Sequence, residues 1–308
     1  MNNNLSPQQI VALNKKHYRF VDLNLCNKGE GLFDNHIDMA YIITMENSKR
    51  IPKFMKQLKD NKPYYKVKIL YNKGYKNTDK ILPIRKTNYD LVDANKQIFT
   101  DAKKNNYKNI LILEDDIIFS DNYSQKDIDN IGHFINSNKY HTYNIGPSGV
   151  YLLYPTSFNM LHYRVFLTAV SQSIIYNENY YDIILNEKNN ILHIDSYTNK
   201  IDIIKYNYHK HICHQLFPET ENQKEWYIGI KDYAKFTFLS ICVFKIVIFA
   251  IKYLNLDTTT TNAQGLYYFS KITSFLFLLL MLYLLYSSLF LFIKLKNLIF
   301  GYYNGKKK

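Results

Sequence analysis

The sequence predicts an α/β fold with a mostly parallel sheet, followed by C-terminal transmembrane helices. Short apolar runs alternate with amphipathic segments between residues 37 and 195, turn residues separate them, and a long uncharged apolar run lies near the C-terminus. Strands that alternate with helices favour parallel pairing through right-handed crossovers. The 308 residues leave room for one large domain of about 200 residues and an appendage.

The first half of the predicted domain consists of strand–helix units. Residues 37–45 (IDMAYIITM) are apolar and are interpreted as a buried strand. In the helix that follows, apolar residues recur at i, i+3, i+4 and i+7 from Ile51, and Asn47 or Ser48 is the expected cap. The other elements expected here are a strand at 66–71, a helix at 90–105 and a strand at 110–113.

The second half is less regular. The expected elements are a helix at 127–135, strands within 143–154 and 164–176, and a helix at 177–187. Residues 191–195 (ILHID) are interpreted as a further apolar strand that ends in an acid, Asp195. Two strands that end in carboxylates strengthen the prediction of a catalytic crevice, although an Asp at a strand end is also a common turn residue.

Three consecutive carboxylates, Glu114, Asp115 and Asp116, directly follow the apolar run at 110–113. In an extended chain Glu114 and Asp116 share one face and Asp115 takes the other. The carboxyl ends of buried strands are where open α/β sheets bind ligands. Adjacent carboxylates repel one another, and a hard divalent cation with oxygen ligands relieves that repulsion. The alternative is a strand that simply ends in solvated acids.

The charge and aromatic content suggest nucleic acid as a partner, but their distribution argues against it. The formal net charge is +13, and 29 Tyr accompany 39 Lys and Arg. Lys, Asn, Ile and Tyr, however, are enriched together along the whole chain, and all four are encoded by A/T-rich codons. We therefore expect no nucleic-acid binding, and we interpret the composition as that of an A/T-rich genome such as a large DNA virus.

Cysteine usage and the N-terminus bear on the compartment. Cys26, Cys213 and Cys242 are odd in number and lack a CxxC spacing, so neither a disulfide framework nor a zinc site is expected. A reducing compartment fits this pattern. The first 20 residues contain no apolar core of signal-peptide length, so secretion through such a signal is not expected.

Residues 272–293 form the most apolar run of the chain and carry no charge. Because that length is sufficient to cross a bilayer core of about 30 Å, the run is predicted to be a transmembrane helix. Residues 236–250 are also apolar but include Lys245, so they form either a second span or an interfacial helix. Lysines after the run favour a cytoplasmic C-terminus. A two-helix hairpin would place the α/β domain on the same cytoplasmic side, and a single span would place it on the other. The absence of a signal peptide and of paired cysteines favours the hairpin, so we expect the catalytic domain on the cytoplasmic side of the membrane.

These observations divide the chain into four parts. The residues before Asn35 are mostly polar and irregular, and are interpreted as a peripheral element. The predicted parts are an N-terminal arm (1–35), an α/β domain (36–232), a membrane anchor of one or two helices (233–300) and a basic tail (301–308).

Several segments, in the same order, resemble glycosyltransferase family 25, which includes lipooligosaccharide and collagen galactosyltransferases. AYIITMENSKRIPKFMKQL is similar to the opening strand and helix of that family, and LILEDD at 111–116 is similar to its acidic metal motif. SQSIIYNENYYDIIL at 171–185 and HIDSY near Asp195 are similar to two later segments. The resemblance covers about residues 37 to 226.

The resemblance implies a GT-A fold and roles for five residues. Glu114 and Asp116 would hold Mn²⁺ or another divalent cation, with Asp116 as a direct ligand. Asp115 would lie toward the ribose of the nucleotide, and Arg50 would contact the phosphates of the donor. The family inverts the configuration of the transferred sugar, so a base must accept the proton of the acceptor hydroxyl, and Asp195 is the candidate. The implied partners are a nucleotide sugar, a glycan, lipid or protein acceptor, and a membrane.

Two departures from the family pattern motivate other functions. Ser171-Gln172 stands where the family usually has Thr-His, and Asp93-Ala94-Asn95 stands where it has a Ser-His pair. One alternative is an inactive, membrane-attached module of the same fold that binds a nucleotide sugar or a glycan. A metal-dependent phosphoesterase is a third possibility, but that chemistry normally requires additional His ligands near the acids, and the sequence offers no such cluster there.

Overall fold

A computed structural model describes residues 5–146, 149–157, 159–169, 172–188, 190–215, 279–284 and 286–289. In these residues the helices are α1 (Pro7–Asn14), the 3-10 helix η1 (Lys15–His17), α2 (Ile51–Asn61), α3 (Thr87–Lys104), α4 (Gln125–Ser137), α5 (Glu178–Leu185) and α6 (Ile194–Lys200). The strands are β1 (Tyr18–Asn24), β2 (Met39–Met45), β3 (Lys66–Asn72), β4 (Asn109–Glu114), β5 (Ile117–Phe119), β6 (Thr142–Asn144), β7 (Gly149–Pro155), β8 (His162–Ala169), β9 (Ser173–Asn177), β10 (Lys205–Tyr208) and β11 (Cys213–Gln215).

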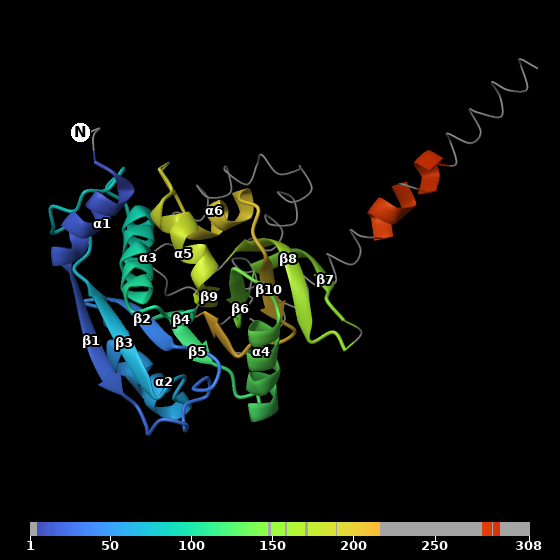
Figure 1. Cartoon of the computed structure of the whole chain (residues 1–308), viewed down its shortest axis with the longest axis horizontal. Coiled ribbons are helices and arrows are strands. Elements are labelled where there is room, and N and C mark those ends of the chain that lie inside the picture. The colour runs from blue at the N-terminus through green and yellow to red at the C-terminus, as the bar shows by residue number, and fades with distance from the viewer. Residues whose placement is uncertain are drawn as a thin grey trace, which may run out of the picture.

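A nine-stranded sheet forms the centre of the fold, in the order β1-β3-β2-β4-β9-β6-β10-β8-β7 (Figure 1). The neighbours β3 and β2, β2 and β4, and β6 and β10 pair in parallel, and the other neighbouring pairs are antiparallel. It follows that β2, β3, β4, β6, β7 and β10 run in one direction, and β1, β8 and β9 run against them. The predicted α/β class with a large, mostly parallel sheet is confirmed.

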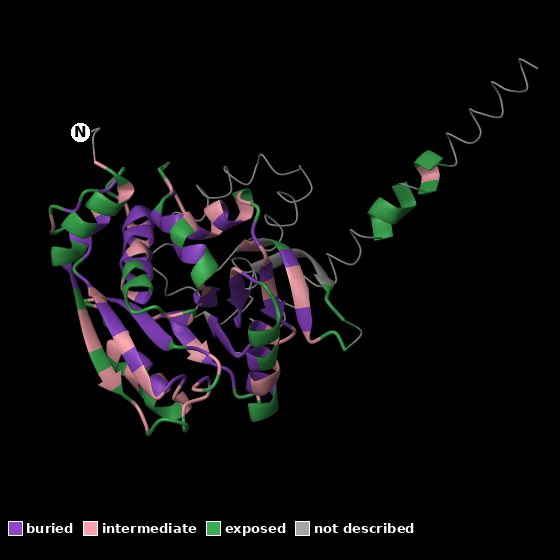
Figure 2. Ribbon diagram, viewed as in Figure 1, coloured by how far each residue is buried: buried purple, intermediate pink, exposed green. Residues whose placement is uncertain are grey.

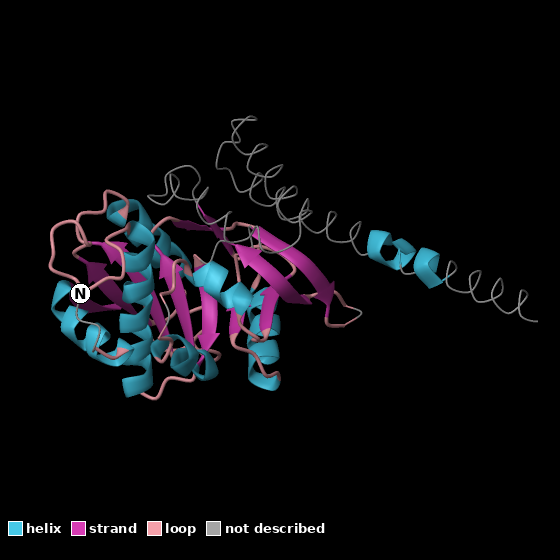
Figure 3. Ribbon diagram, turned by 90° about the horizontal axis from the view of Figure 1, so that it is seen from above, coloured by secondary structure: helices cyan, strands magenta, loops and turns pink. Residues whose placement is uncertain are grey.

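Helices cover both faces of this sheet (Figure 3). On one face, the ring of Phe99 from α3 packs on Tyr176 of β9, with ring centroids 5.1 Å apart. On the other, Phe134 from α4 lies 5.7 Å from Tyr143 of β6. Tyr143 pairs with Ile175, and Ile175 and Tyr176 point to opposite faces because side chains alternate along a strand. The central strands are therefore buried on both sides, as Figure 2 shows.

Burial on both faces explains why the central strands could be predicted from the sequence. All residues of β2 except the last are buried, and the four residues of β4 between Asn109 and Glu114 are fully buried. A strand covered on both faces has a continuous apolar sequence rather than an alternating one. The predicted strands at 66–71 and 110–113 and the predicted helix at 90–105 match β3, β4 and α3.

Two local expectations were wrong. Residues 191–195 do not form a strand: Asp195 lies in the first turn of α6, and His193 caps that helix. The N-cap of α2 is Arg50 rather than Asn47 or Ser48, and Ser48 Oγ accepts a hydrogen bond from the Arg50 backbone N–H at 3.3 Å. Short apolar segments do not distinguish a strand from a buried helical turn by periodicity alone, which explains the first error.

The N-terminal segment is also more regular than expected. The region interpreted as an irregular arm contains α1, η1 and β1, and β1 pairs antiparallel with β3 over the register Tyr18↔Asn72 to Asn24↔Lys66. This edge strand, YRFVDLN, is buried only at Tyr18 and is otherwise exposed or half-buried. Because one edge and much of its surface face solvent, its apolar signal is weak.

The predicted membrane anchor falls mostly outside the described residues. This applies to the whole of 236–250 and to all of 272–293 except 279–284 and 286–289, which are helical. No helix within the described part of the chain is long and apolar enough to cross a membrane. The described residues of this segment are nevertheless exposed apart from the half-buried Ser287, and they include Leu282 and Tyr283 at 54% and 65% exposure.

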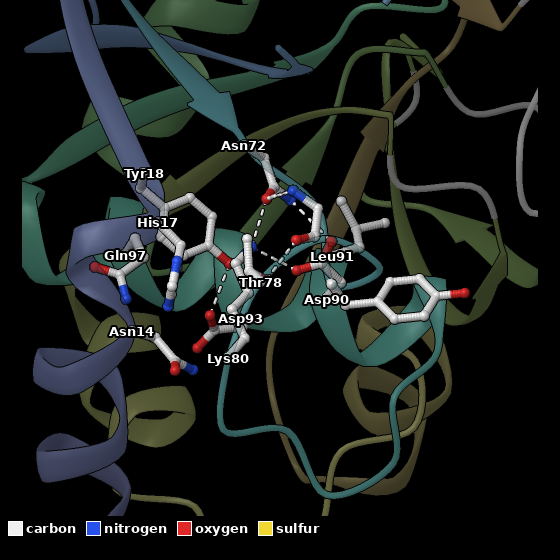
Figure 4. Close-up of polar contacts among 12 residues, drawn as sticks. Asn14, His17, Tyr18, Asn72, Thr78, Lys80, Asp90, Leu91, Asp93 and Gln97 are labelled. Carbon is white, nitrogen blue, oxygen red and sulfur yellow. Dashed lines mark hydrogen bonds and ion pairs between the residues drawn. The ribbon is translucent and has the colours of Figure 1, made fainter. Parts of the chain in front are cut away.

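A buried polar network fixes the loop after β3 at the carboxyl edge of the sheet (Figure 4). Lys80 Nζ forms an ion pair with Asp90 Oδ1 at 2.7 Å, and it also donates to Asn72 Oδ1. Asn72 Nδ2 donates to Asp90 Oδ2 at 3.1 Å. The ammonium of Lys80 lies 3.9 Å from the centroid of the Tyr18 ring, and Tyr18 Oη donates to Asp93 Oδ2 at 2.7 Å. The network thus joins β1, β3, the loop and α3.

The N-terminal segment is attached to the same loop. Asn14 Nδ2 donates to the Ile81 carbonyl at 3.0 Å, and the Ile81 N–H donates to Asn14 Oδ1 at 2.8 Å. Arg85 Nη2 donates to the Thr78 carbonyl at 2.7 Å within the loop. Burial raises the pKa of Asp93 to about 6, and the hydrogen bonds from Tyr18 and Asn14 act in the opposite direction. The contacts between Asn14 and Ile81 thus join the C-terminal end of α1 to the loop.

Replacing Lys80 with Met should lower the free energy of unfolding by about 3–5 kcal/mol, because it leaves the Asp90 carboxylate buried without its cation. The matched control is Lys103→Met, since the ion pair of Lys103 with Asp182 is 57% and 56% exposed, against 0% and 4% for Lys80 and Asp90. The control should cost less than about 1 kcal/mol. Urea denaturation of both variants measures the difference, and equal losses would contradict the structural role of Lys80.

Candidate functional site

The acidic motif lies where the parallel strands β2, β3 and β4 end. Glu114 is the last residue of β4, and Asp115 and Asp116 form the turn that leads into β5. A two-stranded antiparallel sheet of β5 and β11 continues from this turn, with Ile117 opposite Gln215. The acids thus occupy the edge of the sheet at which α/β folds bind ligands.

Two residues of the first strand–helix unit donate hydrogen bonds to the Asp115 carboxylate. Thr44 Oγ1 donates to Asp115 Oδ2 at 2.6 Å, and Arg50 donates to Asp115 Oδ1 from Nε at 3.0 Å and from Nη2 at 2.7 Å. The Asp115 side chain is 4% exposed. Two of the residues predicted to bind the donor, Asp115 and Arg50, therefore contact each other. Sequence reasoning did not identify Thr44, which carries no motif signal of its own.

Glu114 lies within electrostatic reach of the other acids. Burial raises the pKa of Glu114 well above its usual range, and the negative charges of Asp116, Asp195 and Asp115 raise it further, in that order. Arg50 acts in the opposite direction. Asp116 is itself buried. Glu114 and Asp116, the predicted metal ligands, and Asp195, the predicted base, are thus brought together, with Asp116 and Asp195 each within electrostatic reach of Glu114.

Asp195 reaches the cluster from α6, and a buried lysine holds that helix in place. Lys205 Nζ donates to the Thr198 carbonyl at 3.1 Å, near the C-terminal end of α6, and to the Phe166 carbonyl of β8 at 2.7 Å. Burial lowers the pKa of Lys205 to about 8. Asp195 and Lys205 both line a cavity of about 10 Å³, together with Tyr176. A cavity of that size holds about one water molecule.

Gln172 is a further residue of this edge whose position the sequence did not predict. Its backbone carbonyl accepts a hydrogen bond from the Glu114 N–H at 2.9 Å, and its Nε2 donates to the Gly146 carbonyl at 2.8 Å. The side chain is deeply buried, at 1% exposure. A Cβ on Gly146 would collide with Ser173 Oγ and with the Cys213 carbonyl, so this close packing requires glycine. In the sequence, Gln172 was notable only as a departure from a family pattern.

The donor atoms available at the cluster are suited to a hard cation. Glu114 and Asp116 offer carboxylate oxygens, which Mg²⁺, Mn²⁺ and Ca²⁺ prefer. Within the residues that the structure describes, no three His, Cys, Asp or Glu side chains are arranged to hold a metal ion by themselves. A cation at this edge would therefore need oxygen ligands beyond those residue types, from an amide, a carbonyl, water or the substrate.

Comparison with known proteins leaves the family open. No protein-family model matches the sequence, and the curated proteins contain no match. Solved structures with some similarity include A197 from STIV, at 14% identity and a TM-score of 0.33, over 55% of this chain and 81% of that one. Two structures of UDP-glucose pyrophosphorylase, without ligand and with UDP-glucose, are 10% and 12% identical at a TM-score of 0.33, over 55% of this chain and 72% of theirs. Similarity at this level transfers no function.

Replacing Glu114 with Gln should stabilise the protein at alkaline pH. A raised pKa in the folded state means that Glu114 contributes stability below its unfolded value, near 4.5, and that this contribution is lost as pH rises through the folded value. Measured in EDTA at pH 8, Glu114→Gln should therefore have a higher free energy of unfolding than the unmodified protein, and at pH 4 it should gain nothing.

The exposed Glu178 provides the control for this measurement. Glu178→Gln should change the free energy of unfolding by no more than about 0.5 kcal/mol at either pH. A Glu114→Gln variant that is less stable than the unmodified protein at pH 8 would contradict the proximity of the three acids.

Proposed function

We propose that the protein is a membrane-attached glycosyltransferase that moves a sugar from a nucleotide-diphosphate donor to a hydroxyl group on a glycan, lipid or protein. The observation that carries this proposal is the meeting of Glu114 and Asp116, which follow β4, with Asp195 of α6 at the carboxyl edge of the parallel strands. The resemblance of the acidic motif and its flanking segments to glycosyltransferase family 25 supports the donor class.

Binding of the donor is assigned to four residues. Glu114 and Asp116 would hold a divalent cation, preferably Mn²⁺, which when bound neutralises charge on the leaving diphosphate. Arg50 and Asp115 form one rigid unit next to these acids, because two guanidinium nitrogens of Arg50 contact a single oxygen of Asp115. In this proposal Asp115 faces the ribose, and Arg50 adds positive potential on the side of the phosphates.

Asp195 is proposed as the general base. In an inverting transfer, the acceptor oxygen forms a bond to the anomeric carbon while the bond from that carbon to the diphosphate breaks. The acceptor hydroxyl loses its proton to the base, and the nucleoside diphosphate leaves. Asp195 lies in the first turn of α6, where the helix dipole favours a carboxylate, and Lys205 anchors the other end of the same helix.

An inactive binding module of the same fold is the alternative, and one structural observation favours it. Where family 25 has a Ser-His pair, the residues of this chain have structural roles. Asp93 accepts a hydrogen bond from Tyr18 inside the buried network, and Asn95 Nδ2 donates to the Leu91 carbonyl within α3. Such a module would bind the nucleotide sugar and release it unchanged.

Attachment to a membrane is supported by the exposed apolar helix. Leu279, Leu280 and Met281 are 46%, 46% and 42% exposed on one helical turn, next to the exposed residues of 282–284. A helix that is apolar on all sides is stable when lipid or protein surrounds it. We place the α/β domain on the cytoplasmic side, as in the two-helix hairpin, where it lies on the same side as the basic C-terminal tail.

Asp116→Ala should weaken Mn²⁺-dependent binding of a nucleotide sugar by at least about tenfold, or 1.4 kcal/mol. The variant should remain folded, since the substitution removes one charge from a repelling cluster. Asp121→Ala, at an exposed position five residues further on, should bind as the unmodified protein does. Calorimetric titration with a panel of UDP- and GDP-sugars measures affinity, and release of free nucleotide distinguishes transfer or hydrolysis from simple binding. Equal affinity in Asp116→Ala would contradict the assignment.

Membrane attachment and sidedness are tested with sealed vesicles whose cytoplasmic face points outward. The full chain should sediment with the vesicles, and added protease should digest the α/β domain. A chain that ends at Asp232 should stay in the supernatant. Protection of the domain from protease would reverse the assigned side, and a full chain that does not sediment would remove membrane attachment from the proposal.

A further inference from the structure

Gln172 lies directly across a strand pair from Glu114. In the antiparallel pairing of β4 and β9, Leu113 is opposite Ser173. The hydrogen bond from the Glu114 N–H to the Gln172 carbonyl, at 2.9 Å, continues this register by one residue. Residues opposite each other in such a pair have Cβ atoms about 4.5–5.5 Å apart and side chains on the same face of the sheet. The side chains of Gln172 and Glu114 therefore leave the sheet on the same face, from opposite positions on neighbouring strands.

The amide of Gln172 is oriented, and one of its ends has no hydrogen bond. Nε2 donates to the Gly146 carbonyl at 2.8 Å, which fixes which end of the amide is the oxygen. Oε1 is buried and has no hydrogen-bond partner among the described residues. Leaving a buried acceptor unsatisfied costs about 1–3 kcal/mol. A buried carbonyl oxygen held in this way, on the face of the sheet that carries Glu114, is suited to a ligand that carries positive charge.

We infer that Gln172 Oε1 supplies a neutral third oxygen ligand to the divalent cation that Glu114 and Asp116 would hold. The inference rests on the proposed function, because it names one more residue of the same cation site. Side-chain amide oxygens are ordinary ligands of hard cations. A neutral ligand also adds no further negative charge to this group of acids.

A second buried glutamine provides a matched control. Gln97 is 3% exposed, and its Nε2 also donates to a backbone carbonyl, that of Val11, at 2.7 Å. It lies on α3 in contact with α1, away from the acids. Replacing either glutamine with Leu removes one buried hydrogen bond to a carbonyl, so the two variants have similar costs for folding. Only the variant at position 172 removes an oxygen beside Glu114.

The experiment measures binding of Mn²⁺ alone to the full chain in detergent, from the loss of the electron paramagnetic resonance signal of free Mn²⁺. Gln172→Leu should weaken the affinity for Mn²⁺ about tenfold or more, as loss of a supporting group at a metal site does. Gln97→Leu should stay within about twofold of the unmodified protein. Equal Mn²⁺ affinity in the two variants would overturn the role of Gln172.

Gln172→Glu keeps an oxygen at this position and serves if Gln172→Leu does not fold. It should bind Mn²⁺ at least as tightly as the unmodified protein, and Mn²⁺ should raise its melting temperature by more. Weaker binding in Gln172→Glu would count against a ligand at this position. If the unmodified chain binds no Mn²⁺ at all, the proposed cation site fails and the inference fails with it. If it binds and Gln172→Leu binds Mn²⁺ as tightly as the unmodified protein does, only the inference fails.

Discussion

The repulsion that Glu114 meets from Asp116 and Asp195 is the constraint on which the site depends. Each acid is held in place by a different part of the fold. Pairing of β4 with β2 and β9 fixes Glu114, the turn into β5 fixes Asp116, and α6, anchored by Lys205, presents Asp195. Nothing in local secondary structure requires three carboxylates at one edge. An arrangement that costs stability and that several elements maintain together is typical of a binding or catalytic site.

Two other buried acids of the same edge each form an ion pair. Asp90 pairs with Lys80, and Asp115 pairs with Arg50. These two ion pairs fix the loop after β3 and the start of α2, on either side of the end of β2. They are structural, since breaking either pair would leave a buried charge uncompensated. The two ion pairs thus hold the edge together around the acids that we propose as cation ligands.

The sequence predicted the parts of this picture that depend on local patterns. The apolar runs of β2 and β4 and the periodic faces of α2 and α3 are local, and the order of these elements placed Glu114 at a strand end. The antiparallel strand β9 inserts between β4 and β6, which periodicity cannot show, so the proximity of Gln172 to Glu114 was not predictable. The contact of Arg50 with Asp115 joins residues 65 positions apart, and no sequence spacing indicates it.

The central claim is that the edge formed by Glu114, Asp116 and Gln172 binds a divalent cation. The most direct test is a crystal grown with MnCl₂ and UDP, with diffraction recorded at the manganese absorption edge. The account predicts an anomalous peak within about 2.6 Å of side-chain oxygens from all three residues. A manganese ion bound elsewhere, or an acidic edge without a peak at saturating MnCl₂, would contradict it.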